Sequence, residues 1–99
     1  MTWRVLIDPL VAEEDLPALD KAARRRVMEA VRKKLSIDPE AFGEPLRREL
    51  FGYWKLRVAD YRVIYRIDKK VVTVVVVKIG MRKDSQVYSE MIARLKKLG

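Results

Sequence analysis

The sequence contains no cysteine and no histidine among its 99 residues. The lack of cysteine excludes disulfide bonds and thiolate metal sites. The lack of histidine removes the commonest metal ligand and the commonest acid–base catalyst. We therefore expect neither a metal ion nor a cofactor, and any catalysis would have to use Lys, Arg, Tyr, Asp or Glu side chains.

Long apolar runs are also missing. The longest one, Val71 to Val77, is interrupted by Thr73, and it is far shorter than the roughly 20 residues that a membrane-spanning helix needs. The first apolar run of the chain contains Arg4 and Asp8, unlike a secretory signal peptide. These features predict a cytoplasmic protein with no membrane partner, and 99 residues suit a single domain over the whole chain.

The positive charge lies in one half of the chain. Residues 1–50 carry ten Lys/Arg and ten Asp/Glu, whereas residues 51–99 carry twelve and four, so the net charge of +8 belongs entirely to the second half. Such asymmetry favours a polyanion or an acidic protein as partner. The alternative is a basic surface without any partner.

Hydrophobic periodicity and turn residues give the order of elements. Asp20 is a good N-cap for a helix whose apolar residues recur every four positions. We predict an α+β fold in the order β-α-α-β-β-β-α, with one antiparallel-type twisted sheet of about four strands. A two-helix hairpin would cover one face, and a short helix would end the chain. The predicted strands cover residues 3–7, 53–58, 61 onward and 71–79, the helices 10–19, 21–35 and 87–98, and a loop 36–46.

The segment from Tyr53 to Tyr65 alternates between apolar and polar side chains, as a half-buried strand does. Its second strand begins at Tyr61, after a turn at Ala59 and Asp60. The two strands would bring three cations close together, namely Lys55, Arg57 and Arg62. Grouping like charges costs electrostatic energy that an anionic ligand would offset. The alternative is that these cations form the solvated face of a half-covered sheet.

Two segments of the sequence resemble the RelE/ParE family of toxins from type II toxin–antitoxin systems. They read G-E-P-L-R-R-E-L-F-G-Y-W-K-L-R-V-A-D-Y-R-V-I-Y and G-M-R-K-D-S-Q-V-Y, and the likeness covers nearly the whole chain. In this family, RelE-type members are ribosome-dependent mRNA endonucleases and ParE-type members act on DNA gyrase. The matched positions favour the RelE branch.

The resemblance implies a set of site residues. Lys55, Arg62, Arg82 and Tyr88 match catalytic positions, while Arg57, Tyr53 and Lys83 would contact the RNA and its phosphates. Two positions depart from the family: Tyr53 stands where RelE-type enzymes commonly have a lysine, and Ala59 stands where a turn glycine is frequent.

The chemistry that these residues would perform uses the 2′-hydroxyl of RNA as the nucleophile. That hydroxyl needs a base, the phosphate needs charge stabilisation, and the leaving 5′-oxygen needs a proton. Lys55 or Tyr88 would be the base, and nearby arginines would lower the pKa of Lys55. Arg62 would hold the phosphate, and Arg82 would meet the leaving oxygen.

The resemblance also implies partners. They are a cognate, RelB-like antitoxin, the ribosome and mRNA, with operator DNA bound only through the antitoxin. Two other functions stay open at this point: a ParE-like toxin that poisons gyrase, and a non-catalytic nucleic-acid-binding domain.

Overall fold

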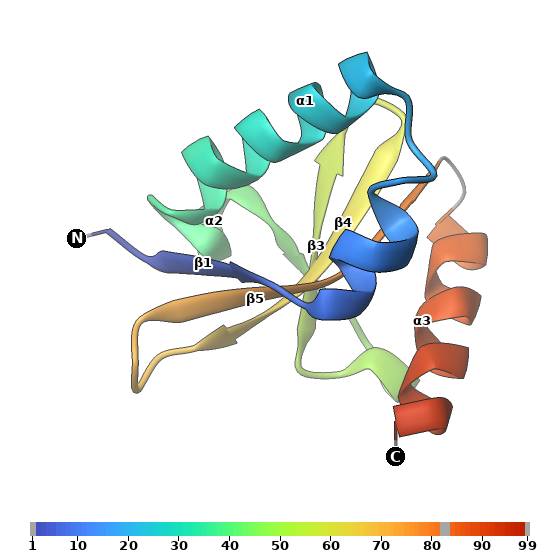
Figure 1. Ribbon diagram of the computed structural model, residues 1–99. Helices are drawn as coiled ribbons and strands as arrows, with labels where there is room; N and C mark the ends of the chain where they lie inside the picture. The colour runs from blue at the N-terminus through green and yellow to red at the C-terminus, as the bar shows by residue number, and fades with distance from the viewer. Residues whose placement is uncertain (1, 82–83, 99) are drawn as a thin grey trace.

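The computed structural model describes residues 2–81 and 84–98. Five strands form one mixed sheet in the order β1-β5-β4-β3-β2 (Figure 1). The α+β class predicted from the sequence is confirmed, as is the antiparallel pairing of the three late strands. The strands are β1 (Arg4–Ile7), β2 (Glu44–Pro45), β3 (Tyr53–Val58), β4 (Tyr61–Asp68) and β5 (Thr73–Met81).

Two details of the predicted sheet are wrong. The first strand runs parallel to β5 at the edge of the sheet, because the helical segments that follow β1 return the chain across the sheet before β3 begins. The predicted loop over residues 36–46 contains the short helix α2 (Pro39–Phe42) and the fifth strand, β2. Pro39 starts α2 instead of breaking it, since a proline is favoured at the first helical position.

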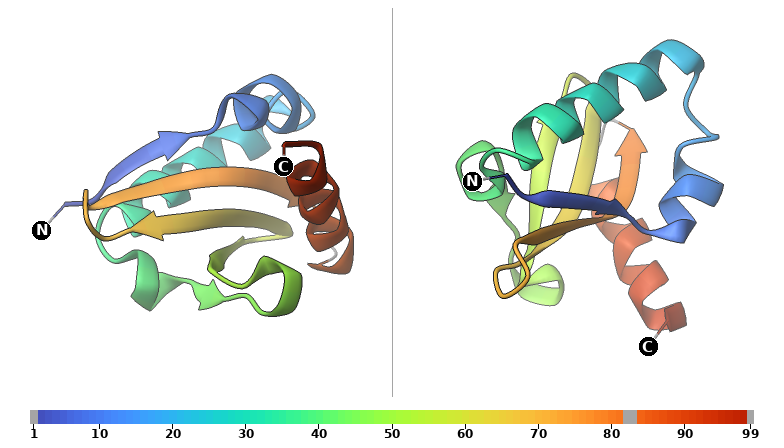
Figure 2. Two further views of the ribbon diagram at one scale, coloured as in Figure 1. Left: turned by 90° about the horizontal axis from the view of Figure 1, so that it is seen from below. Right: turned by 60° about the vertical axis from the view of Figure 1, so that its left-hand side comes forward.

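One face of the sheet is covered by the predicted helical hairpin (Figures 1 and 2). Its second helix is α1 (Lys21–Ala30), which continues without a break into a π-helical segment, η2 (Val31–Leu35). Asp20 caps α1 by accepting a 2.8 Å hydrogen bond from the backbone N–H of Ala23. The apolar stripe of this helix is buried against the sheet at Val27, Val31 and Leu35.

The first helix of the hairpin is shorter than predicted, because the π-helical turn η1 (Val11–Asp15) ends where Pro17 can no longer donate a backbone hydrogen bond.

The C-terminal helix α3 (Asp84–Leu98) packs on the other face. Val87 and Met91 of this helix are buried against Ile64 and Val77. The 3-10 turn η3 (Arg48–Leu50) completes this second core. A Cβ atom added to Gly80 would lie 2.7 Å from a methyl carbon of Val87, so glycine permits the close approach of α3 to β5.

A β-bulge in β5 breaks its alternation. Tyr65 pairs with Val76 and the preceding Ile64 pairs with Lys78, so Val77 is the extra residue. As a result, Val77 and Lys78 both lie on the α3 side of the sheet, while Ile79 returns to the core under α1. Bulges re-aim side chains in this way, and here the bulge directs a lysine from a valine-rich strand toward α3.

In the part of the chain that the structure describes, no helix is long and apolar enough to cross a membrane.

Tyr65 ties the segment around α2 to the centre of the sheet. Its side chain is fully buried, and its hydroxyl donates a 2.6 Å hydrogen bond to the backbone carbonyl of Pro39. Burial, together with the carboxylates of Asp38 and Glu40, raises the pKa of Tyr65 far above its ordinary value. A Cβ atom on Gly43 would lie 1.7 Å from this hydroxyl, so the hydrogen bond needs a glycine at this position.

We predict that Gly43→Ala destabilises the fold by about 1–3 kcal/mol, the usual range for an overpacked core. Tyr65→Phe removes the colliding oxygen, so it should recover part of that loss in the double variant. Urea unfolding of the two single variants and the double variant measures this coupling. Strictly additive losses would show that Gly43 is not needed for the approach of Tyr65.

Candidate functional site

The register of β3, β4 and β5 brings the predicted basic residues together on the α3 side of the sheet. Arg57 of β3 is the direct cross-strand partner of Arg62 of β4, and Arg62 is paired in turn with Gly80 of β5. Lys55 lies two residues from Arg57 on the same face, about 7 Å along the strand. The sequence-based prediction that Lys55, Arg57 and Arg62 are neighbours is therefore confirmed.

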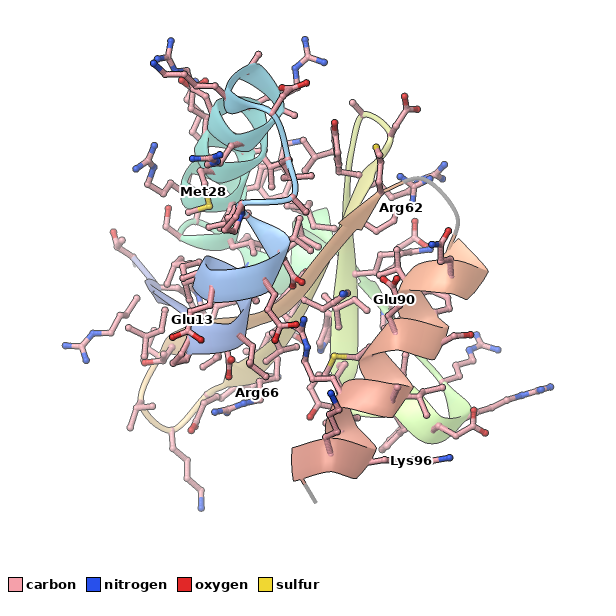
Figure 3. The ribbon with its side chains drawn as sticks, turned by 45° about the vertical axis from the view of Figure 1, so that its right-hand side comes forward. Glu13, Met28, Arg62, Arg66, Glu90 and Lys96 are labelled. Atoms are coloured by element: carbon pink, nitrogen blue, oxygen red, sulfur yellow. The ribbon has the colours of Figure 1, made fainter. Side chains whose placement is uncertain are left out.

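Arg62 is held at the end of the sheet, next to the first turn of α3 (Figure 3). Only 8% of its surface is exposed. One terminal nitrogen of the guanidinium, Nη1, donates to the carbonyls of Ala59 and Tyr61, at 3.2 and 3.0 Å. Ala59 has a φ of +52°, in the left-handed region that favours glycine. The turn therefore fixes Arg62 through its carbonyls even though it lacks the usual glycine.

Lys55 meets Tyr88 from α3. The side chain of Lys55 is almost completely buried, and its Nζ atom lies 5.7 Å from the centroid of the Tyr88 ring. Nζ also lies 3.8 Å from a carboxylate oxygen of Glu44, which is mostly exposed. An ammonium group over an aromatic face is attracted by the ring. The packing of α3 thus brings together the two residues that the sequence nominated as alternative bases.

The remaining predicted residues line the rim of this site or fall outside the described part of the chain. Arg57 is exposed, and Tyr53 is half-buried beside its cross-strand partner Arg66. Arg82 and Lys83 lie outside the described residues, so their placement stays a prediction. Among residues 2–81 and 84–98, no three Asp or Glu side chains gather closely enough to hold a metal ion.

Sequence reasoning missed a second group of charges on this face, formed by Asp15, Lys78, Glu90 and Arg94. Asp15 lies in η1 and is 5% exposed, yet it contacts Lys78 of β5 and Arg94 of α3. The residues belong to three separate elements, η1, β5 and α3, and the periodicity within one element does not reveal a contact between elements. The signal that could have revealed the group was the single lysine inside a strand made almost entirely of valines.

Comparison with known proteins gives consistent matches over most of the chain. The family model that describes the ParE toxin of the type II toxin–antitoxin system, parDE, matches residues 10–85. Toxin RelG of Mycobacterium tuberculosis is 40% identical over 73 residues, which make up 74% of this chain and 84% of RelG. The mRNA interferase toxin RelE of Escherichia coli is 42% identical over 41 residues, 41% of this chain and 43% of that protein.

Solved structures share the fold. The toxin–antitoxin complex RelBE2 of Mycobacterium tuberculosis contains a chain that is 36% identical and superposes with a TM-score of 0.78, covering 85% of this chain and 95% of that one. A mutant of the Escherichia coli toxin RelE in its free state is 26% identical, with a TM-score of 0.70 and coverage of 95% and 98%.

The pairing of Arg57 with Arg62 predicts a gain in stability when one charge is removed. Like charges directly opposite on a sheet are destabilising, so Arg57→Gln should stabilise the fold by about 0.2–1 kcal/mol, at the lower end because Arg57 is exposed. The same variant should bind single-stranded RNA more weakly. Urea unfolding at low and high salt measures the first effect, and fluorescence anisotropy with a labelled oligonucleotide measures the second.

The matched control is Arg25→Gln, which removes the same charge from an exposed position of α1. It should lower RNA affinity less than Arg57→Gln. Equal losses of affinity would mean that net charge, and not this face of the sheet, governs binding.

Proposed function

Since this chain belongs to the RelE/ParE superfamily of type II toxin–antitoxin toxins, on its RelE branch, we propose that it is a ribosome-dependent mRNA endonuclease. It would inhibit translation in the cytoplasm and be neutralised by a cognate, RelB-like antitoxin. The relative in Escherichia coli is named an mRNA interferase toxin, and the RelBE2 structure is that of a toxin–antitoxin complex.

The observation that carries the proposal is the convergence of Lys55, Arg57, Arg62 and Tyr88 on one face of the sheet. Two arginines stand directly opposite each other, and the nearly buried Lys55 faces the ring of Tyr88. Grouped cations of this kind attract a polyanion such as RNA.

The reaction would use the nucleophile that RNA itself supplies. Lys55 or Tyr88 takes the proton of a 2′-hydroxyl, and the resulting oxygen attacks the adjacent phosphorus. The bond from phosphorus to the 5′-oxygen then breaks, which leaves a 2′,3′-cyclic phosphate and a 5′-hydroxyl. Charge that develops on the phosphate oxygens would be stabilised by Arg62 and by the neighbouring Arg57. The reaction as proposed is metal-independent, because these cationic side chains would stabilise the negative charge on the phosphate in place of a metal ion.

Other groups would complete the site. Arg82 is proposed to protonate or stabilise the leaving oxygen, and Lys83 and Tyr53 to contact the RNA. Tyr53 replaces a lysine that is common in RelE-type enzymes, so this site holds one cation fewer and one more ring for stacking on a base. The ribosome would present the mRNA in a productive geometry, which supplies much of the rate.

The antitoxin would bind the same basic surface. An acidic or amphipathic segment of the antitoxin would complement the positive half of the chain. The toxin would then contact operator DNA only through the antitoxin.

A second candidate function is poisoning of DNA gyrase, which the match to the ParE toxin model favours. It predicts growth arrest with intact mRNA and with DNA damage. That toxicity would survive the loss of Lys55 and Arg62, because it would need a docking surface and no RNA chemistry.

We predict that Arg62→Ala lowers the rate of mRNA cleavage on the order of 10²–10³-fold, as removal of a preorganised donor does. Arg62→Lys should recover only part of this rate, because an ammonium lacks the planar fork of a guanidinium. Primer extension on cellular mRNAs after induced expression, and on a defined message in a reconstituted translation reaction, measures cleavage.

Arg25→Ala is the matched control, because Arg25 is an exposed arginine of α1, on the opposite face of the sheet. It should cleave like the unchanged protein, and circular dichroism should show both variants to be folded. Cuts within translated regions that disappear in Arg62→Ala support the proposal. Growth arrest with intact mRNA would overturn it and support the gyrase reading.

A further inference from the structure

Asp15 is the buried centre of a network of charges, which we call the Asp15 cluster: Asp15, Lys78, Glu90 and Arg94. Asp15 and Lys78 are buried, Arg94 is partly buried and Glu90 is exposed. Arg94 binds the carboxylate of Asp15 with two hydrogen bonds, from Nη2 to Oδ1 at 2.8 Å and from Nη1 to Oδ2 at 3.0 Å. Lys78 Nζ donates to Oδ1 at 3.2 Å and lies 3.3 Å from Glu90 Oε1. The backbone N–H of Ile79 donates to Oδ2 at 2.9 Å.

The Asp15 cluster contributes more to the placement of α3 than to the free energy of folding. Burying ions costs free energy that their attraction often fails to exceed, so apolar replacements can be equally stable. A two-bond contact between a guanidinium and a carboxylate, in contrast, fixes both distance and direction. Arg94 makes a third directed contact, a 2.9 Å hydrogen bond from Nη1 to the carbonyl of Val77. These bonds tie one side of α3 to β5 and to η1.

The cluster and the candidate site lie on opposite sides of α3. Across the sheet, Lys55, Ile64 and Lys78 form one row of cross-strand neighbours. Tyr88 meets Lys55 at one end of the row, and Glu90 meets Lys78 at the other. Residues two apart on a helix point about 200° away from each other, so the contacts of Glu90 determine where Tyr88 points.

Apolar packing alone would leave α3 freer to move. Val87 lies against Gly80 and Met91 is buried, but hydrophobic contacts are non-directional. A slip of α3 by one residue would shift Tyr88 by about 1.5 Å and turn it by about 100°. The directed bonds of Arg94 and the contact of Glu90 with Lys78 oppose such a slip. These two residues of α3, Glu90 and Arg94, are four apart and so lie on the same side of the helix.

We propose that Asp15 is a positioning residue: by holding Arg94 and Lys78, it sets the axial position and rotation of α3, and so keeps Tyr88 against Lys55. The part of this proposal that concerns cleavage rate rests on the proposed function, whereas the part that concerns the placement of Tyr88 does not. Asp15 is only 5% exposed and its carboxylate oxygens accept hydrogen bonds from Arg94, Lys78 and the N–H of Ile79, so it would not touch the RNA.

The first test measures the contact of Tyr88 with Lys55 directly. We expect Asp15→Asn, which keeps the size of the side chain and removes its charge, to abolish the nuclear Overhauser effects between the Tyr88 ring and the ε-protons of Lys55. Effects between β3, β4 and β5 should persist. Glu40→Gln is the control, because it breaks an exposed 3.2 Å ion pair with Lys69 away from α3, and it should leave the Tyr88 contact unchanged.

The second test measures the catalytic consequence. In a reconstituted translation reaction, Asp15→Asn should lower kcat on the order of 10²-fold, which is the scale of a misplacement of about 1 Å. The KM should change little, because Arg57 and Arg62 keep their places on the sheet. In a Tyr88→Ala background, Asp15→Asn should cause almost no further decrease in kcat, because there is no ring left to position.

Three outcomes separate the possibilities. The proposal is overturned if Tyr88 still contacts Lys55 in the folded Asp15→Asn protein. It is also overturned if Asp15→Asn lowers kcat as much in the Tyr88→Ala background as in the unchanged protein. If Asp15→Asn loses the sheet contacts as well, Arg94→Lys decides, since it keeps the charge and loses the two-bond geometry. If the unchanged protein cleaves no mRNA, the proposed function fails, and the nuclear Overhauser measurement still decides the role of Asp15.

Discussion

The pairing of β4 with β3 and β5 is the constraint on which the rest of the structure depends. β4 is the central strand of the sheet, and its four consecutive residues from Arg62 to Tyr65 are buried. One side of β4 contributes Val63 and Tyr65 to the core under α1, and the other contributes Ile64 to the core under α3. Because a shift of one residue would exchange these faces, the two cores fix the register.

That register determines which charges meet. With Ile64 held beside Lys55, Arg62 must lie opposite Arg57, and both arginines face the side where α3 crosses the sheet. Two like charges, those of Arg57 and Arg62, therefore lie opposite each other, because the alternation of β3 and β4 puts both side chains on this face. Elsewhere on the same side, the charges balance: the Asp15 cluster contains two cations and two carboxylates within hydrogen-bonding range. Lys55, Arg57 and Arg62 thus lie on one side of α3, while the Asp15 cluster anchors its other side.

Much of this arrangement could be predicted from the sequence, because hairpins are local. The alternation from Tyr53 to Tyr65 and the short turn at Ala59 were sufficient to place Lys55, Arg57 and Arg62 on one face. The cap at Asp20 and the four-residue spacing of apolar residues were sufficient for the helix on the opposite face. The first strand was predicted, but its parallel pairing with β5 was missed, because that pairing joins distant parts of the chain. The small helix α2 was missed because a proline can either begin or break a helix.

The sequence by itself determined that Lys55 and Arg57 share one side of β3 and that Trp54, Leu56 and Val58 share the other, since the period of two is a property of the extended backbone. Only the tertiary structure decided that Lys78 leaves this pattern, because the bulge opposite Ile64 and Tyr65 arises from the fit between two strands. It also decided that Asp15 and Arg94 meet across 79 positions of the chain. No local periodicity encodes such a contact, because it forms only when η1, β5 and α3 are packed together.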